Sequence, residues 1–157
     1  MSLSDCHRWL GERSVGTLAQ LDSSPPQTKI AVAVVCRTDE NDQPQILVGS
    51  RGEGQTLAGF REFPGGKIQH DETVFEAAER ECDEETGVPV GAIELLTVTQ
   101  HAYEYGQLEL HFVFCEPRGA AIPQSPFEGL PLASLNSCRF PAANRDALAC
   151  LQARCGI

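Results

Sequence analysis

The chain is short of basic residues, and this shortage excludes one class of partner. It has 12 Lys and Arg against 22 Asp and Glu, which gives a formal net charge of −10. A field of this sign repels nucleic-acid backbones and anionic lipid surfaces, so binding to polymeric nucleic acid or to a membrane is not expected. A small phosphorylated substrate is compatible only where a cation or a local cluster of Arg and Lys reverses the field.

Long apolar runs are also missing. No stretch approaches the roughly 20 apolar residues that span a bilayer, and the N-terminus lacks an apolar core of signal-peptide length. The seven cysteines are an odd number spread through apolar stretches, which is typical of reduced thiols. Zinc is not expected, because Cys150 and Cys155 have no second Cys or His pair in a compact pattern. The sequence therefore predicts a soluble, cytoplasmic protein without disulfides.

With 157 residues, 41% of them hydrophobic, and no internal repeats, the chain suits one domain. Residues 1–28 are expected to be an N-terminal extension and linker, because Pro25-Pro26 interrupts any helix there. Residues 29–157 are expected to form the domain itself. The extension could pack on this domain or form an oligomer contact, as in a homodimer, and the sequence leaves both open.

The chain alternates strand and helix patterns. Apolar, β-branched runs at 30–36 and 45–48 predict one hairpin, and runs at 93–103 and 108–116 predict another. A helix is expected over 72–86, closed by Gly87, and a second over 144–155 with Asn144 as a plausible N-cap. This order of elements predicts an α/β fold.

The helix at 72–86 carries two sets of acidic residues. At roughly 100° per residue, Glu81, Glu84 and Glu85 fall on the side of its apolar stripe. Carboxylates that converge at the edge of a core need counter-charge, and oxygen-only ligands favour Mg²⁺ or Mn²⁺. The alternative is a surface helix in which Arg80 pairs with Glu76 or Glu84. Wheel geometry alone leaves both open.

A glycine-rich loop stands directly before this helix. In Phe63-Pro64-Gly65-Gly66-Lys67 two glycines allow a close backbone approach, and Lys67 supplies one cation for phosphate. A turn of this kind is common by itself, but its fixed spacing from the acidic helix makes the combination specific.

Together these residues resemble the box of the Nudix family, G-x5-E-x7-R-E-U-x-E-E-x-G-U, with U a bulky aliphatic residue. Cys82 is the one departure, at an aliphatic position, and it should leave the chemistry intact. The resemblance implies a Nudix-type α/β/α sandwich with a mixed β-sheet. The box positions in this chain are Gly66, Glu72, Arg80, Glu81, Cys82, Glu84, Glu85, Gly87 and Val88.

The resemblance also implies roles for these residues. Glu81, Glu84 and Glu85, with the backbone carbonyl of Gly65, would hold the metal ions. Arg80 would orient Glu81, and Glu81 could alternatively act as the base. Glu72 and Gly87 would be largely structural. The family's reaction is attack of water on a phosphorus of a nucleoside diphosphate derivative, which requires metal-stabilised oxygens and an activated water.

Outside the box, residues 29–152 look like the MutT-type branch, which hydrolyses oxidised guanine nucleotides. By this resemblance Asn144 would hydrogen-bond the purine, for which a side-chain amide suits because it both donates and accepts. Arg51 would belong to the nucleotide site, and Phe63 would line the base pocket. Two features depart from the branch. Gly129 stands where a Trp is common, and a loop glutamate that acts as ligand or base has no clear match among Glu116, Gln124 and Glu128.

The sequence therefore predicts Mg²⁺-dependent hydrolysis of a nucleoside triphosphate to the monophosphate and pyrophosphate, with 8-oxo-dGTP or a related damaged nucleotide as substrate. The alternatives are a modified cytidine triphosphate, an NDP-sugar or a dinucleotide polyphosphate. A different class is a nucleotide-sensing Nudix domain that binds without cleaving. Such domains often lose a box glutamate, whereas this chain retains all of them.

Overall fold

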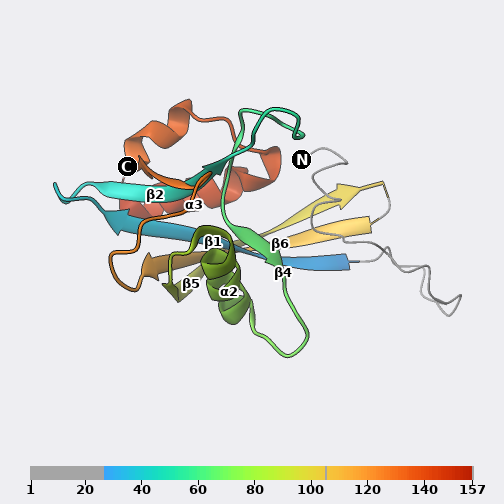
Figure 1. The fold of residues 1–157 in the computed structure, drawn as a ribbon. Coiled ribbons are helices and arrows are strands. Elements are labelled where there is room, and N and C mark those ends of the chain that lie inside the picture. Colours follow the sequence, from blue (N-terminus) through green and yellow to red (C-terminus); the bar gives the residue numbers. More distant parts are fainter. Residues whose placement is uncertain (1–26, 105, 157) are drawn as a thin grey trace, which may run out of the picture.

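A mixed β-sheet runs through the middle of the molecule, with helix α2 on one face and helix α3 on the other (Figure 1). The computed structural model describes residues 27–104 and 106–156, so most of the predicted N-terminal extension lies outside the described residues. The elements are β1 (Gln27–Thr38), β2 (Pro44–Ser50), β3 (Arg61–Glu62), β4 (Gly65–Lys67), α2 (Val74–Thr86), β5 (Val90–Tyr103), β6 (Gly106–Pro117), β7 (Glu128–Pro131), 3-10 helices at Leu132–Ser137 and Ala142–Asn144, and α3 (Arg145–Cys155).

The strand order is β3-β2-β1-β6-β5, with β4 paired to β1 and β7 to β2. The pairing of β1 with β6 is parallel, and the other pairs are antiparallel. Both predicted hairpins are confirmed, one joining β1 to β2 and the other joining β5 to β6. β1 and β5 begin three residues before the predicted strands, at Gln27 and Val90. The α/β sandwich on a mixed sheet is therefore confirmed.

β1 is buried on both faces, and its two sets of side chains fill two cores. Ile30, Val32 and Val34 pack into the core beneath α3. Ala31 and Ala33 alternate with them and pack against α2. Because alanine is small, α2 can approach the sheet closely on this side. Helix α2, which carries the predicted metal ligands, is thereby held on the centre of the sheet.

Helix α2 begins two residues later than predicted. Thr73 caps it, because the Thr73 hydroxyl accepts a hydrogen bond from the Glu76 amide (3.1 Å) and the Glu76 carboxylate accepts one from the Thr73 amide (2.8 Å). This reciprocal capping satisfies the first backbone donors and leaves Glu72 in the preceding loop. At the other end Gly87 has φ 72°, as the sequence predicted for a left-handed cap.

Helix α3 begins at Arg145, and the expected side-chain N-cap at Asn144 is wrong. Asn144 ends a short 3-10 helix with φ −90° and ψ −5°, and its side chain makes no capping hydrogen bond. A capping side chain needs an extended backbone at its own residue, and here the backbone is already helical. The Asn144 amide is therefore not committed to the helix terminus.

Within the described ranges, no helix is both long and apolar enough to cross a membrane. All six cysteines in the same ranges are free. Cys82, at the aliphatic box position, is fully buried against the core beneath α2. It fills its position as a small apolar side chain would.

Candidate active site

Arg80 connects the glycine-rich loop to the acidic helix. Its Nε and Nη2 atoms donate to the two carboxylate oxygens of Glu72, at 3.0 and 2.6 Å. Nη2 also donates to the Lys67 carbonyl at 3.1 Å. The guanidinium lowers the pKa of Glu72, and the carboxylate raises that of Arg80. This two-point ion pair fixes the loop against α2.

The same guanidinium holds two of the three carboxylates predicted to bind metal. Arg80 Nη1 donates to Glu81 at 2.8 Å and to Glu84 at 3.2 Å. The Glu81 side chain is 15% exposed, whereas that of Glu84 is 59% exposed. A Cβ atom at Gly66 would lie 2.4 Å from a Glu81 carboxylate oxygen. Glycine at this position therefore gives the Glu81 carboxylate its place against the loop.

Glu85 and Arg51 line one cavity of about 310 Å³ between the end of α2 and the end of β2. This volume is at the lower limit of small-molecule sites. Two residues far apart in the sequence that were both predicted to belong to the site are thus brought together. The remaining lining residues are Gln55, Glu62, Pro126 and Phe127.

The three carboxylates do not form one compact cluster. Among the described residues, no group of three or more His, Cys, Asp or Glu side chains is arranged to hold a metal ion. Glu84 binds Arg80 at the helix surface, whereas Glu85 lines the cavity that contains Arg51. Repulsion between the two negative charges favours keeping these carboxylates apart. The donor set still fits a hard divalent cation, because these side chains offer only oxygen ligands next to a glycine backbone.

Phe63 and Asn144 lie on the other side of the sheet. The Phe63 ring is buried in the core beneath α3 and stacks on Phe140, with ring centroids 5.1 Å apart. This contact joins the loop that carries Phe63 to the segment that leads to Asn144, the two residues predicted to bind the base. Asn144 is half-buried at the start of α3, and its neighbours Pro141 and Arg145 line a cavity of about 340 Å³.

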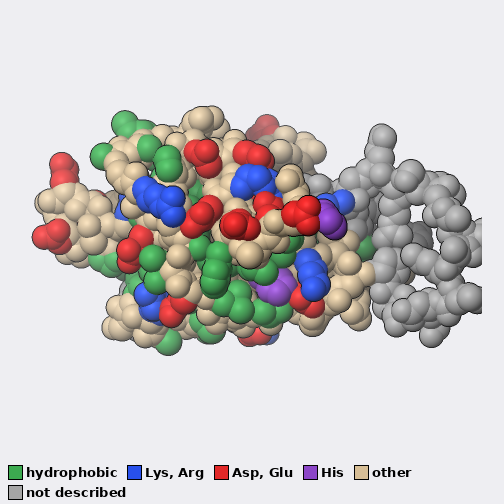
Figure 2. Space-filling view, turned by 90° about the horizontal axis from the view of Figure 1, so that it is seen from below, with side chains coloured by type: hydrophobic (Ala, Val, Ile, Leu, Met, Phe, Trp, Pro, Cys, Tyr) green, Lys and Arg blue, Asp and Glu red, His purple; other side chains and the backbone are tan. Residues whose placement is uncertain are grey.

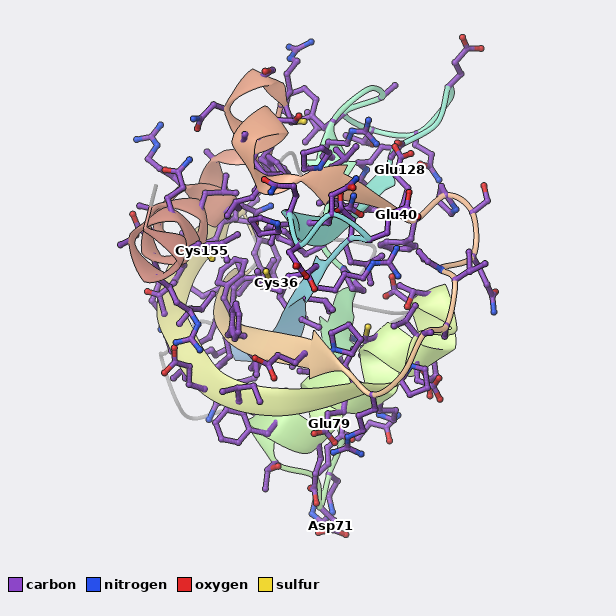
Figure 3. The ribbon with its side chains drawn as sticks, turned by 90° about the vertical axis from the view of Figure 1, so that its left-hand side faces the viewer. Cys36, Glu40, Asp71, Glu79, Glu128 and Cys155 are labelled. Atoms are coloured by element: carbon purple, nitrogen blue, oxygen red, sulfur yellow. The ribbon has the colours of Figure 1, made fainter. Side chains whose placement is uncertain are left out.

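The three candidates for a loop carboxylate lie in different places. Glu128 forms an ion pair with Arg61 (2.8 Å) and lies well apart from Glu79 of α2 in Figure 3. Glu116 lines a cavity of about 640 Å³ at the other end of the sheet. Gln124 lies against the end of α2, where its backbone N–H donates to the Thr86 carbonyl at 2.8 Å. The residue next to α2 is therefore an uncharged amide.

No pattern in the sequence indicated that Phe127 forms one wall of the cavity beside Arg51. Phe127 is buried, and a Cβ atom at Gly49 would lie 2.9 Å from its ring. Gly49 in β2 therefore leaves space for the ring of Phe127, which lies 78 residues later in the chain. Contacts of this kind depend on the path of the loop and not on a local pattern.

Comparison with known proteins gives the family. The NUDIX domain model matches residues 27–148. The 8-oxo-dGTP diphosphatase of Escherichia coli is 31% identical over 128 residues, which cover 79% of this chain and 97% of that protein. The corresponding protein of Haemophilus influenzae is 32% identical over 119 residues, covering 74% and 88%.

Solved structures agree on the fold. The NUDIX domain of Shewanella oneidensis NrtR, complexed with ADP ribose, matches with a TM-score of 0.69 and 21% identity over 87% of this chain and 95% of that one. A MutT protein from Methanosarcina mazei matches with a TM-score of 0.63 and 20% identity over 80% and 92%. With its complete box and these relatives, the chain belongs to the Nudix hydrolase family, on its MutT-like branch.

Proposed function

We propose that this enzyme hydrolyses 8-oxo-dGTP, or a related damaged nucleoside triphosphate, to the monophosphate and pyrophosphate. The main support is the pair of relatives named 8-oxo-dGTP diphosphatase, one of which is matched over 97% of its length. The shared cavity adds support, because Arg51, a cation that would bind phosphate, lines it together with Glu85, a predicted metal ligand.

Nudix hydrolases generally use a divalent metal, and Mg²⁺ is the ion proposed here, with Mn²⁺ as a substitute. Glu81, Glu84, Glu85 and the Gly65 carbonyl would hold it. When bound, the metal would stabilise anionic phosphate oxygens and activate the attacking water. The oxygen-only donor set supports a hard cation of this kind.

Residues of the chain would orient the reacting groups, bind the phosphates and bind the base. Arg80 holds the Glu81 carboxylate at 2.8 Å and would orient it, either toward the metal or to accept a proton from water at a carboxylate oxygen. Arg51 and Lys67 would bind phosphate oxygens. The Asn144 amide would bind the purine edge, and Phe63 would support the base site through its contact with Phe140.

A phosphate-release screen with Mg²⁺ tests the substrate. It should compare 8-oxo-dGTP with dGTP, a modified dCTP, NDP-sugars and dinucleotide polyphosphates. We expect 8-oxo-dGTP to have the highest kcat/KM. If an NDP-sugar is preferred and 8-oxo-dGTP is no better than dGTP, the substrate proposal is wrong although the family stands.

Glu84→Gln tests the metal role against the alternative of a sensing domain that only binds nucleotide. Turnover at saturating Mg²⁺ should fall by orders of magnitude, because the substitution removes a charged ligand. Glu40→Gln, at an exposed position in the β1–β2 turn, is the control. Unchanged turnover in Glu84→Gln would exclude the proposed role, and a wild-type chain that binds but cleaves none of the screened substrates would favour the sensor.

A cytoplasmic location and a homodimer complete the proposal. The six free cysteines of the described ranges support a reducing compartment.

Sedimentation of the intact chain tests the homodimer, since a monomer mass at all concentrations would exclude it.

A further inference from the structure

Two cysteines far apart in the sequence meet at the edge of the core beneath α3. Cys36 lies near the end of β1, and Cys155 is the last residue of α3. Both are only half-buried, and both pack against the same hydrophobic core. Their thiols are hydrogen-bonded to each other, and Figure 3 shows Cys155 at the end of α3 with Cys36 next to it on the sheet. The two sulfur atoms are therefore already in contact, which is the first requirement for a disulfide.

Arg154 holds the end of α3 in this position. Its guanidinium stacks over the Phe114 ring of β6, 4.1 Å from the ring centroid, and forms an ion pair with Glu94 of β5. The helix ends directly afterwards at Gly156, which is in the left-handed region with φ 73°. Cys155 is thus held against β1 at a helix terminus, where the backbone adjusts more easily than it does within a helix.

The pair can be reached by small molecules. Cys36 lines a cavity of about 640 Å³, together with Phe114 on the same side of the sheet. A cavity of this volume admits an organic molecule of moderate size. The charged side chains of its lining are Arg37, Asp39 and Glu116. A small polar reagent can therefore approach the Cys36 side chain without unfolding of the core.

A second pair of cysteines lies on the opposite side of the sheet and is closed to solvent. Cys82 and Cys115 belong to the core beneath α2, and burial followed by the nearby Cys82 raises the pKa of Cys115. Both side chains are 0% exposed. Figure 2 shows a band of acidic side chains across this side of the molecule, which repels an anionic reagent. We therefore expect this second pair to stay reduced.

We propose that Cys36 and Cys155 form a disulfide by exchange with a low-molecular-weight disulfide, and that this bond cross-links α3 to β1. The Cys155 thiolate attacks one sulfur of the small disulfide, which gives a mixed disulfide and releases one small thiolate. The Cys36 thiolate then displaces the second small thiolate from Cys155. Both protein thiols are thereby oxidised, and the small disulfide is reduced to two thiols that take up the two protons. The cross-link does not depend on the proposed catalysis.

The order of the two attacks follows from the surroundings of Cys36. Burial raises the pKa of this thiol to about 11, and the charge and hydrogen bond of Cys155 add to the increase. Cys36 is therefore protonated at neutral pH, and the first attack belongs to Cys155. Once Cys155 is a mixed disulfide it carries no charge, so the Cys36 thiolate forms more readily for the second attack.

Peptide mapping of the intact chain after incubation with oxidised glutathione at pH 8 tests the proposal. Trypsin releases Cys36 in peptide 30–37 and Cys155 in peptide 155–157. Without reduction, we expect these two peptides to be linked, and dithiothreitol should separate them. The oxidised chain should also melt roughly 5–10 °C higher than the reduced one, because the bond closes a long loop in the unfolded state.

Cys150→Ser is the matched control, because Cys150 is another half-buried cysteine of α3 and its loss should leave the link unchanged. Cys155→Ser should abolish both the link and the rise in melting temperature. In urea, Cys155 of the wild type should instead pair mainly with Cys150, because the loop between them is far shorter.

Four results with the folded wild type would overturn the proposal, and none of them requires a variant that folds. They are a Cys36 and Cys155 that both stay reduced, a Cys155 that remains a mixed disulfide with glutathione, the same pattern of links as in urea, and a linked chain that melts no higher than the reduced one.

Discussion

Arg80 and Glu72 form a two-point ion pair, with nitrogen–oxygen distances of 3.0 and 2.6 Å, across the boundary between the glycine-rich loop and α2. Both side chains are largely buried, at 22% and 14% exposure. Removing one partner leaves the charge of the other poorly hydrated and unpaired, which lowers the free energy of unfolding. The pair therefore makes the loop and the helix one rigid unit.

Glu72→Gln should lower the free energy of unfolding at pH 7 by about 1–3 kcal/mol, since a hydrogen bond to a charged group is lost. The pKa of Glu72 is below its ordinary value of 4.5 in the folded protein, mainly through the hydrogen bonds from Arg80. Its contribution is therefore complete above pH 4.5 and is lost as the pH falls through the folded-state pKa. Urea unfolding of both proteins across this range measures the difference.

The difference between wild type and Glu72→Gln should shrink on acidification. Glu40→Gln is the control, because Glu40 is exposed, and its unfolding free energy should follow the wild type at every pH. A difference for Glu72→Gln that is independent of pH would show that the carboxylate charge is not what stabilises the loop.

Gly66→Ala should reduce kcat more than it reduces stability. The new Cβ would lie 2.4 Å from the Glu81 carboxylate, the flexible end of a side chain that can move aside. Displacement of a catalytic group by about 1 Å can cost roughly 100-fold in rate. Steady-state kinetics with Mg²⁺ and a thermal unfolding curve measure the two effects separately.

Gly52→Ala is the matched control for Gly66→Ala. A Cβ at Gly52 meets nothing within 4 Å. Its kcat and melting temperature should both stay near the wild-type values. Equal kcat in the two variants would mean that the position of Glu81 against the loop does not matter for turnover.

Gly87→Ala and Gly156→Ala separate backbone strain from a specific contact. Both glycines end a helix in the left-handed region, with φ 72° and 73°. A Cβ at Gly87 would lie 2.5 Å from the Gln124 side chain, whereas one at Gly156 meets nothing within 4 Å. Both variants should lose about 1 kcal/mol from strain.

Only Gly87→Ala should also change activity. Moving Gln124 shifts the loop that brings Pro126 and Phe127 to the Arg51 cavity, so KM should rise. Chemical denaturation and KM for the preferred nucleotide measure the two effects. An unchanged KM in Gly87→Ala would show that this loop does not contribute to substrate binding.

The local pattern of the chain predicted the elements well but not their ends. The continuous apolar, β-branched run in β1 and the glycine after α2 follow from residue type and backbone preference, and both were found. The start of α2 was missed by two residues because Thr73 forms a capping box. At Asn144, the preceding 3-10 turn decided the conformation and removed the expected side-chain cap.

The candidate site was predictable only where it lies in one segment. Spacing along the box placed Arg80 next to Glu81, and the structure has them in contact. The i,i+4 spacing also indicated the pair of Arg80 with Glu84, which the structure has at 3.2 Å. The sequence could not show that Phe127 closes the cavity beside Arg51. That contact depends on the path of a loop distant in sequence.

The buried thiols provide a last prediction about the core beneath α2. Burial raises the pKa of Cys82 to about 11 and that of Cys115 to about 12. At pH 8 very little of either side chain is therefore thiolate, the form that reacts with alkylating reagents. Both should stay unmodified by iodoacetamide in the folded protein and react fully in urea, as measured by mass spectrometry of the peptides.

Cys150 is the internal control, because it is only half-buried in the middle of α3 and is accessible without unfolding. It should be alkylated before Cys82 in the same sample. Early modification of Cys82 would mean that α2 separates from the sheet in the native state. A helix that opened in this way would not keep Glu81 against Gly66, so the alkylation rate also tests how rigidly the fold holds the proposed metal site.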